Sequence, residues 1–149
     1  MSVMWKYLDK RTATIRAIED YENMQFIINN TDDEVKGVRD GMVGLGSPNM
    51  DGMPHAHNPQ AGEERILDGI EKIDILKERY RQAVEYMSWF KPAWETLSED
   101  DKYVLECTVM TEGSGIEEIC DHFSIERTSA YSKKSRAIRK LSTCLYGQD

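Results

Sequence analysis

The sequence predicts an all-α protein, in which an N-terminal antiparallel helical hairpin with coiled-coil-like spacing precedes a domain of three shorter helices. Two observations predict the hairpin: apolar residues recur with helical spacing in two long segments, and a stretch rich in Gly and Pro separates these segments. A third observation predicts the second domain, because short amphipathic segments with helix-start signals follow residue 97. We therefore expect a helical hairpin over residues 1–92 and a three-helix domain over residues 93–149.

The composition limits the class of protein and the cellular compartment that we expect. The chain has 149 residues, of which 40% are hydrophobic and 31% are charged, as in an ordinary soluble globular protein. No apolar run approaches the roughly 20 residues of a membrane span, and the N-terminal residues lack an apolar signal core. The three cysteines, which are Cys107, Cys120 and Cys144, match no zinc or disulfide spacing. We therefore expect a protein of the reducing cytoplasm with no membrane partner.

The first predicted helix covers residues 1–29. A break or restart is predicted at Asn30-Thr31, because Thr31 and Glu34 have the spacing of a capping box. A short helical continuation is expected to reach about Arg39.

Residues 41–62 are predicted to form a loop, because Gly, Pro and turn dipeptides break any periodic element there. His55 and His57 in this loop have no Asp, Glu or Cys at ligand spacing, so we expect no metal site. No Gly in the loop precedes a lysine at phosphate-loop spacing, so no nucleotide cofactor is expected either.

The strongest predicted helix covers residues 63–90. Its apolar residues step by three and four positions, the spacing of a left-handed coiled coil, and they are Ile66, Ile70, Ile73, Leu76, Tyr80, Ala83, Met87 and Phe90. One amphipathic helix cannot bury its own stripe, so it must pack on the N-terminal helix or on a second chain. We favour the hairpin within one chain, with which a homodimer through the hairpin is compatible. Lys91-Pro92 is predicted to end the helix, since Pro disfavours helical geometry in the residue before it.

Ser98 is predicted to cap the next helix, with Asp101 at its third helical position. Gly113 and Gly115 are predicted to close this helix. Its inward-facing residues are expected to be Tyr103, Val104, Cys107 and Met110.

Residues 113–141 have the pattern of a helix-turn-helix. A short amphipathic segment over 116–123 is followed by a break at Ser124-Ile125 and by a second helix that opens at Glu126. The second helix is expected to turn Ala130, Ala137, Ile138 and Leu141 toward the core.

The outer face of this second helix is basic, with six Lys or Arg and no Asp or Glu between Arg127 and Lys140. In a helix-turn-helix the second helix enters the major groove, where its early residues reach base edges and its basic residues reach phosphates. The net charge of −8 implies that any DNA binding is local to this helix. The alternative is a solvated cationic face whose charges suit the helix dipole. The candidate DNA-binding residues are Arg127, Thr128, Ser129, Tyr131, Ser132, Lys133, Ser135, Arg136 and Arg139.

The stretch from Gly113 to Leu141 resembles, without a gap, the helix-turn-helix of sigma-factor region 4. The matching residues are Gly113, Glu117, Glu118, Ile119, Ile125, Arg136, Ala137 and Leu141. Three positions depart from that motif: Ser124 stands at its turn Gly, Gly115 stands where a Ser or Thr cap is common, and Glu126 stands at its usual Ser. Gly tolerates a left-handed backbone without steric cost, whereas a carboxylate at position 126 would repel a nearby phosphate.

The whole layout resembles the phage-encoded transcriptional regulators of the RinA/ArpU type, in which a helical hairpin precedes a sigma-like helix-turn-helix. The phrase SPNMDGMPHAHNPQAG, residues 47–62, carries this resemblance together with the long helix after it and the C-terminal motif. The resemblance implies a regulator of phage or prophage late genes that binds double-stranded DNA at a promoter in the bacterial cytoplasm. It also implies host RNA polymerase as a further partner.

Two other functions are compatible with the same fold. An adaptor would bind RNA polymerase or another protein through its acidic scaffold helix and hairpin, which Glu126 and the net charge favour. A DNA-packaging component resembling a terminase small subunit would also pair a helix-turn-helix with helical oligomerisation segments. No nucleophile, base and orienting group recur at a recognisable spacing, so we do not expect an enzyme.

Overall fold

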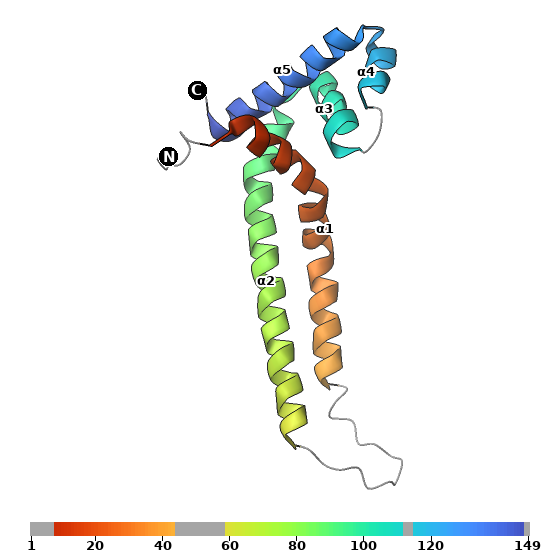
Figure 1. Cartoon of the computed structure of the whole chain (residues 1–149). Coiled ribbons are helices and arrows are strands. Elements are labelled where there is room, and N and C mark those ends of the chain that lie inside the picture. The colour runs from red at the N-terminus through yellow and green to blue at the C-terminus, as the bar shows by residue number, and fades with distance from the viewer. Residues whose placement is uncertain (1–7, 44–58, 112–114, 148–149) are drawn as a thin grey trace. The chain divides into compact units, whose positions relative to one another are not determined.

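The computed structural model describes residues 8–43, 59–111 and 115–147, and these residues form helices but no strand. In chain order the elements are α1 (Lys10–Val43), α2 (Pro59–Glu95), α3 (Glu99–Leu105), the π-helical turn Glu106–Met110, α4 (Gly115–Phe123) and α5 (Arg127–Tyr146) (Figure 1). The predicted all-α fold class is therefore confirmed. None of the described helices is both long and apolar enough to cross a membrane.

The chain divides into two compact units. Unit 1 comprises Met1–Met24 and Tyr86–Asp149, and unit 2 comprises Gln25–Glu85. Each of the long helices α1 and α2 therefore contributes to both units. The predicted division into 1–92 and 93–149 stays a prediction.

Unit 1 has a hydrophobic core to which α1, α2, α3 and α5 contribute. Its buried members are Ala17, Ile18, Phe90, Ala93, Trp94, Leu97, Leu105, Ala137, Ile138, Leu141, Leu145 and Tyr146. The ring centroid of Phe90 lies 5.3 Å from that of Tyr86 and 5.8 Å from that of Trp94. The indole N–H of Trp89 donates to the carbonyl of Leu145 at 3.3 Å, which ties α2 to α5. Aromatic rings bury large areas, so this core holds α5 firmly.

Unit 2 contains the second part of α1 and the first part of α2, which run side by side in opposite directions (Figure 1). A Cβ built on Gly69 of α2 would lie 2.5 Å from the sulfur of Met42 of α1, so the Met42 side chain lies directly against the backbone of α2 there. Among the residues of this unit that the structure describes, few are buried: Ile27, Thr31, Val35, Gly69, Ile73 and Ala83.

The predicted break at Asn30-Thr31 is wrong, because α1 is continuous from Lys10 to Val43. The Thr31 hydroxyl donates to the carbonyl of Ile27 at 2.5 Å, and the Asn30 amide donates to the carbonyl of Phe26 at 2.8 Å. Both side chains thus form hydrogen bonds with carbonyls of the preceding turn of the same helix. They do not cap a new helix, as the sequence had suggested for Thr31. Thr31 is also buried, which favours its continued place in the helix.

The predicted loop at 41–62 is wrong at both of its ends. Residues 41–43 belong to α1 and residues 59–62 to α2, which begins at Pro59. Pro suits the first position of a helix because the N–H that it lacks has no helical acceptor there. Residues 44–58, with His55 and His57, lie outside the described residues, as do residues 1–7 of the first predicted helix.

The helix end predicted at residues 91–92 is also wrong, because α2 passes through Pro92 and ends at Glu95. Phe90, Ala93 and Trp94 are buried in the core of unit 1. Their spacing places them on one helical face, so their burial offsets the hydrogen bond that Pro92 cannot donate.

Candidate nucleic-acid interface

The chain enters the candidate interface through α3, which begins as predicted. The Ser98 Oγ accepts a hydrogen bond from the backbone N–H of Asp101 at 3.2 Å. The prediction that Gly115 closes this helix is wrong, because Gly115 begins α4, and Gly113 lies outside the described residues. The chain leaves α3 through the π-helical turn Glu106–Met110 instead. Such turns often occur at functional sites.

Gly115 permits a close approach between α4 and the π-helical turn. A Cβ at this position would lie 2.1 Å from the carbonyl oxygen of Cys107 and 3.0 Å from the Cα of Thr108. Both are backbone atoms that cannot rotate away, so only Gly fits without a shift of one element. The approach seats α4 on a second hydrophobic cluster, whose buried members are Val104, Ile119 and Ala130.

Three residues, Ser124, Ile125 and Glu126, connect α4 to α5. Ser124 has a φ of 55°, in the left-handed region that favours Gly. The N–H of Ile125 donates to the carbonyl of Cys120 at 3.1 Å, and Glu126 is the N-cap residue of α5 in extended conformation. The Glu126 side chain makes no capping hydrogen bond. The chain therefore forms a helix, a tight turn and a second helix, with the predicted second helix extended to Tyr146.

The inner face of α5 is buried as predicted. Ala130, Ala137, Ile138 and Leu141 have at most 1% of their surface exposed. Leu145 and Tyr146 continue this buried face to the end of the helix. Because one side of α5 is fixed in the protein, its other side has a defined orientation toward solvent.

The candidate DNA-binding residues lie mainly on this solvent side. Seven of them are exposed, namely Arg127, Thr128, Ser129, Tyr131, Ser132, Arg136 and Arg139, and the two half-buried ones are Lys133 and Ser135. Tyr131 keeps 49% of its surface in solvent, although its ring is large and mostly apolar. The exposed side of α5 thus combines guanidinium groups, hydroxyl groups and one aromatic ring.

The cations of α5 differ in how far the chain itself engages them. The ammonium of Lys140 pairs with the Asp101 carboxylate at 3.0 Å, and that of Lys133 lies 4.6 Å from the ring centroid of Phe123. Four cations have neither an ion pair nor a ring contact with a described residue: Arg127, Lys134, Arg136 and Arg139. These four charges are available to an anionic partner, and so is that of Lys133, which no described carboxylate neutralises.

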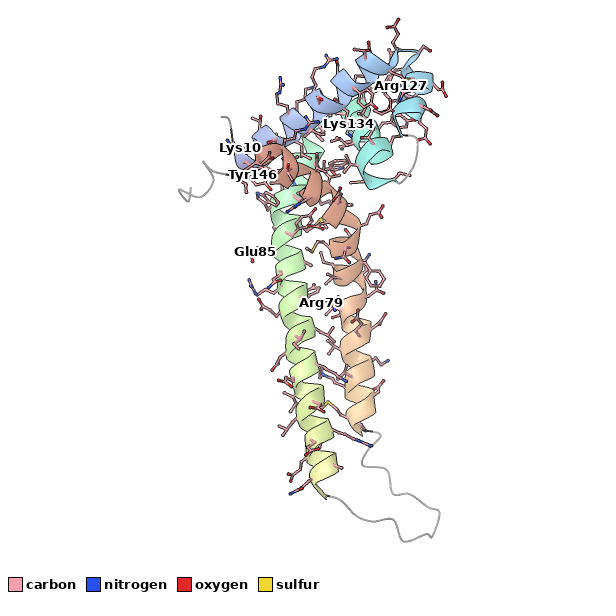
Figure 2. All side chains as sticks on the ribbon, viewed as in Figure 1. Lys10, Arg79, Glu85, Arg127, Lys134 and Tyr146 are labelled. Atoms are coloured by element: carbon pink, nitrogen blue, oxygen red, sulfur yellow. The ribbon has the colours of Figure 1, made fainter. Side chains whose placement is uncertain are left out.

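The sequence-based set omitted Lys134, which lies with Arg127 on α5 (Figure 2). These two residues, together with Tyr131, line one side of a hollow of about 320 Å³. The other side is formed by Thr108, Gly115, Ile116 and Glu117. Helical spacing would have found Lys134, because it follows Tyr131 by three residues and Arg127 by seven. Nothing in the sequence indicated Thr108, since the π-helical turn brings it there.

The described residues contain no group of three or more His, Cys, Asp or Glu side chains placed to hold a metal ion. Comparisons with models of protein families, with curated proteins and with solved structures find no match to this chain. A function for the chain therefore rests on the geometry and charge of α4 and α5.

Proposed function

We propose that this chain is a double-stranded DNA-binding regulator of transcription, of the phage RinA/ArpU type, in which a helical hairpin of α1 and α2 precedes a sigma-like helix-turn-helix. In this proposal α4 is the supporting helix and α5 is the recognition helix. The observation that supports it is the charge of α5, which carries six cations and no acid between Arg127 and Lys140, opposite a buried face. A helix anchored on one side and cationic on the other fits the major groove of duplex DNA.

We assign the side chains of α5 to two kinds of contact by their order along the helix. The first turns of a recognition helix reach base edges, and these turns carry Arg127, Thr128, Tyr131 and Ser132. Later cations reach phosphates, and these are Lys133, Arg136 and Arg139. The hydroxyl groups of Ser129 and Ser135 add hydrogen-bond donors to the sugar-phosphate backbone.

Gel-shift titration tests this proposal, with duplexes tiled across the DNA that flanks the chain's own coding sequence. We expect Arg127→Ala to weaken binding to the preferred duplex by about 1–3 kcal/mol and to relax the preference at one base pair. We expect Arg139→Ala to weaken binding to all duplexes alike and to lower the salt slope by about 1.

Lys140→Ala is the matched control, because Lys140 is an exposed cation of the same helix whose ammonium is held by Asp101. Its loss removes a surface ion pair worth at most about 1 kcal/mol, so this variant should bind DNA nearly as the wild type does. Circular dichroism of each variant checks that α5 is still folded. Undiminished binding by both Arg127→Ala and Arg139→Ala at low salt contradicts the proposal.

A second candidate function is an adaptor that binds host RNA polymerase or another protein. Glu126 favours it, because its exposed carboxylate makes no capping hydrogen bond and stands at the start of α5, where a phosphate would approach. The net charge of −8 favours it as well. Nuclease-treated RNA polymerase core that is retained equally by the immobilised wild type and by Arg127→Ala would support the adaptor.

A further inference from the structure

Unit 2 exposes more large apolar side chains than it buries. Among its described residues the exposed ones are Phe26, Val43, Ile66, Leu67, Ile70, Ile75, Tyr80 and Val84, whereas Ile27, Val35 and Ile73 are the large apolar side chains that are buried. The described part of unit 1 exposes only Leu8 and Tyr131 of this kind. Exposed apolar side chains that gather in one part of a protein mark a surface for another protein.

Half of these exposed side chains share one face of α2. The face contains Ile66, Ile70, Ile73, Lys77, Tyr80 and Val84, and we call it the α2 stripe. Its residues follow one another at steps of four, three, four, three and four, the spacing that keeps a seam straight along a paired helix. Ile75 lies two residues from Ile73, which is about half a turn away, so it belongs to the opposite face.

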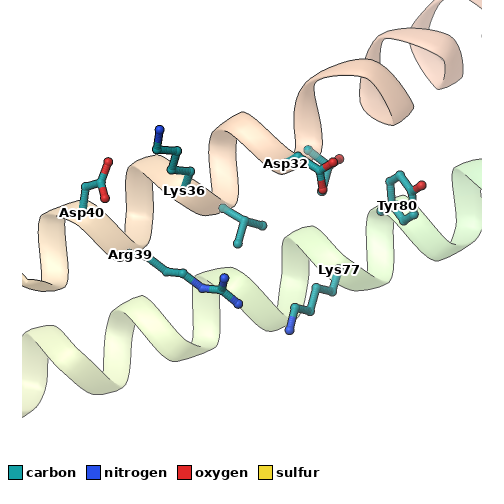
Figure 3. A pocket seen from close by; sticks show the side chains of 8 residues that line it. Asp32, Lys36, Arg39, Asp40, Lys77 and Tyr80 are labelled. Atoms are coloured by element: carbon teal, nitrogen blue, oxygen red, sulfur yellow. The ribbon is translucent and has the colours of Figure 1, made fainter.

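The α2 stripe borders an open groove between the two helices of unit 2. The groove has a volume of about 400 Å³, and Lys77 and Tyr80 line it from α2 (Figure 3). Asp32, Lys36 and Arg39 line it from α1. The surface is therefore mostly apolar along α2, where Lys77 is the one charge of the stripe, and mostly charged along α1, as expected of an interface with an apolar seam and a polar rim.

We propose that the α2 stripe binds the same stripe of a second copy of this chain, with the two α2 helices antiparallel. A two-fold axis relates the two helices of such a pair. A residue of one copy therefore lies opposite the residue of the second copy that is equally far along the sequence from the axis, on its other side. With the axis between Ile73 and Lys77, Ile66 lies opposite Val84 of the second copy. Ile70 then lies opposite Tyr80 of the second copy. Both layers join two apolar side chains.

The charges at the centre of the stripe favour a second copy in antiparallel orientation. There the aliphatic stem of Lys77 covers the small part of Ile73 of the second copy that its own chain leaves exposed. Its ammonium reaches Asp74 of the second copy, which borders the stripe, and the two-fold axis repeats this contact. A parallel pair would instead place Lys77 against Lys77 of the second copy, and the like charges would repel.

The extent of unit 2 is sufficient for a stable dimer. The α2 segment from Gln60 to Glu85 is about 40 Å long at about 1.5 Å per residue, and two helices side by side are about 20 Å wide. One face covers roughly 800 Å² per copy, which is the size of a standard protein–protein interface. Two copies would then form a four-helix bundle. This inference does not rest on the proposed DNA binding.

Sedimentation equilibrium of the full chain at micromolar concentration tests the proposal. We expect the wild type to be a dimer. For Ile70→Glu we expect the dimer dissociation constant to rise by about 100-fold or more, because the two-fold axis places one buried glutamate from each copy in the interface. Ile75→Glu is the matched control, since Ile75 lies on the same helix and is 58% exposed, against 46% for Ile70. This control should remain a dimer. A monomeric wild type, or a dimer that Ile70→Glu leaves intact, overturns the proposal.

Disulfide trapping tests the orientation and is decisive even where Ile70→Glu fails to fold. A mixture of Ile70→Cys chains and Tyr80→Cys chains should form a disulfide-linked heterodimer, because the two positions lie opposite each other. Ile70→Cys chains alone should not cross-link, since the two copies of position 70 are about 15 Å apart along the axis, beyond disulfide reach. The wild type gives the background from the native cysteines. Self-linkage of Ile70→Cys chains above this background overturns the antiparallel pair.

Discussion

Gly115 and Gly37 are both helical glycines, but an added Cβ meets different surroundings at the two positions. At Gly115 it would lie 2.1 Å from the Cys107 carbonyl oxygen, and at Gly37 it would meet nothing within 4 Å. We expect Gly115→Ala to lower the free energy of unfolding by about 1–3 kcal/mol, because one element must shift. Gly37→Ala should raise it by about 0.5–1 kcal/mol, because Ala favours the helix. Urea unfolding of both variants measures the difference, and a change of the same sign in both contradicts this account.

The turn between α4 and α5 makes a similar test possible at Ser124. Its φ of 55° is costly for a residue with a Cβ, and most of all for a β-branched one. We expect Ser124→Gly to raise the free energy of unfolding by up to about 1 kcal/mol and Ser124→Val to lower it by about 1–2 kcal/mol. Ser124 is exposed, so neither change removes buried contacts. Thermal unfolding measures both variants, and a stabilised Ser124→Val would show that the turn is not left-handed.

The thiols of Cys107 and Cys144 should differ in reactivity. Burial raises the pKa of the Cys107 thiol above its ordinary value of 9.0, whereas Cys144 is exposed. At about pH 8 we expect iodoacetamide to modify Cys144 about tenfold faster than Cys107, as peptide mass spectrometry would measure. Comparable rates at both cysteines would contradict the burial of Cys107.

The same raised pKa has a consequence for stability. The unfolded chain loses the Cys107 proton at a lower pH than the folded chain does, so the contribution of Cys107 to stability is complete below pH 9.0. It is lost as the pH rises from there through the folded-state pKa. We expect Cys107→Ser to reduce the loss of stability between about pH 8 and about pH 10, which urea unfolding at several pH values would show.

At the scale of elements, α2 continues through a residue that usually ends a helix, because the residues around it are buried. Pro92 is exposed inside the helix and leaves the carbonyl of the preceding turn without its N–H donor. We expect Pro92→Ala to raise the free energy of unfolding by up to about 3 kcal/mol, because it restores that donor and buries nothing new. Urea unfolding measures the change. A destabilised Pro92→Ala would mean that the packing of Phe90 and Trp94 needs the bend that Pro imposes.

The spacing of apolar residues was sufficient to predict the long helices and α5, because each of these helices is stabilised by the burial of one apolar stripe. It was not sufficient for the helix boundaries. Thr31 continues α1 through a hydrogen bond within the helix. The helix α2 continues through Pro92 because Phe90, Ala93 and Trp94 on either side of it are buried in a core with residues distant in the sequence. Leu105 was missed for a related reason. It is buried in the core of unit 1, whose other members lie far from it in the sequence, so local spacing could not reveal its burial.

The outer side of α5 could be predicted because its charge and its exposure both follow from one helical period. Arg127, Tyr131 and Arg136 are exposed as that period requires. The contribution of Gly115 and Thr108 could not be predicted, since it depends on a π-helical turn that one extra residue creates. Interface residues can thus be predicted from the sequence where they lie on a regular helix. They cannot be predicted where an irregular turn brings them to the interface.

For the molecule as a whole, the proposed DNA binding should depend strongly on salt. The net charge is −8, so attraction to DNA comes from a local set of cations on α5. If Lys133, Arg136 and Arg139 each neutralise one phosphate, a single chain should give a slope of log K against log salt of about −2.7. A rise from about 50 to about 200 mM salt then weakens binding about 40-fold. Fluorescence anisotropy of a labelled duplex measures the slope, and a slope near zero contradicts phosphate binding by α5.

The dimer and the DNA interface make a joint prediction at this scale. Two copies that bind one duplex through both α5 helices engage twice as many phosphates, so the wild type should show a slope of about −5. Ile70→Glu should return the slope to about −2.7, because it removes the dimer and leaves every residue of α5 in place. Ile75→Glu should keep the wild-type slope. Equal slopes for the wild type and Ile70→Glu, with sedimentation still showing their different oligomeric states, would mean that the two copies do not bind DNA together.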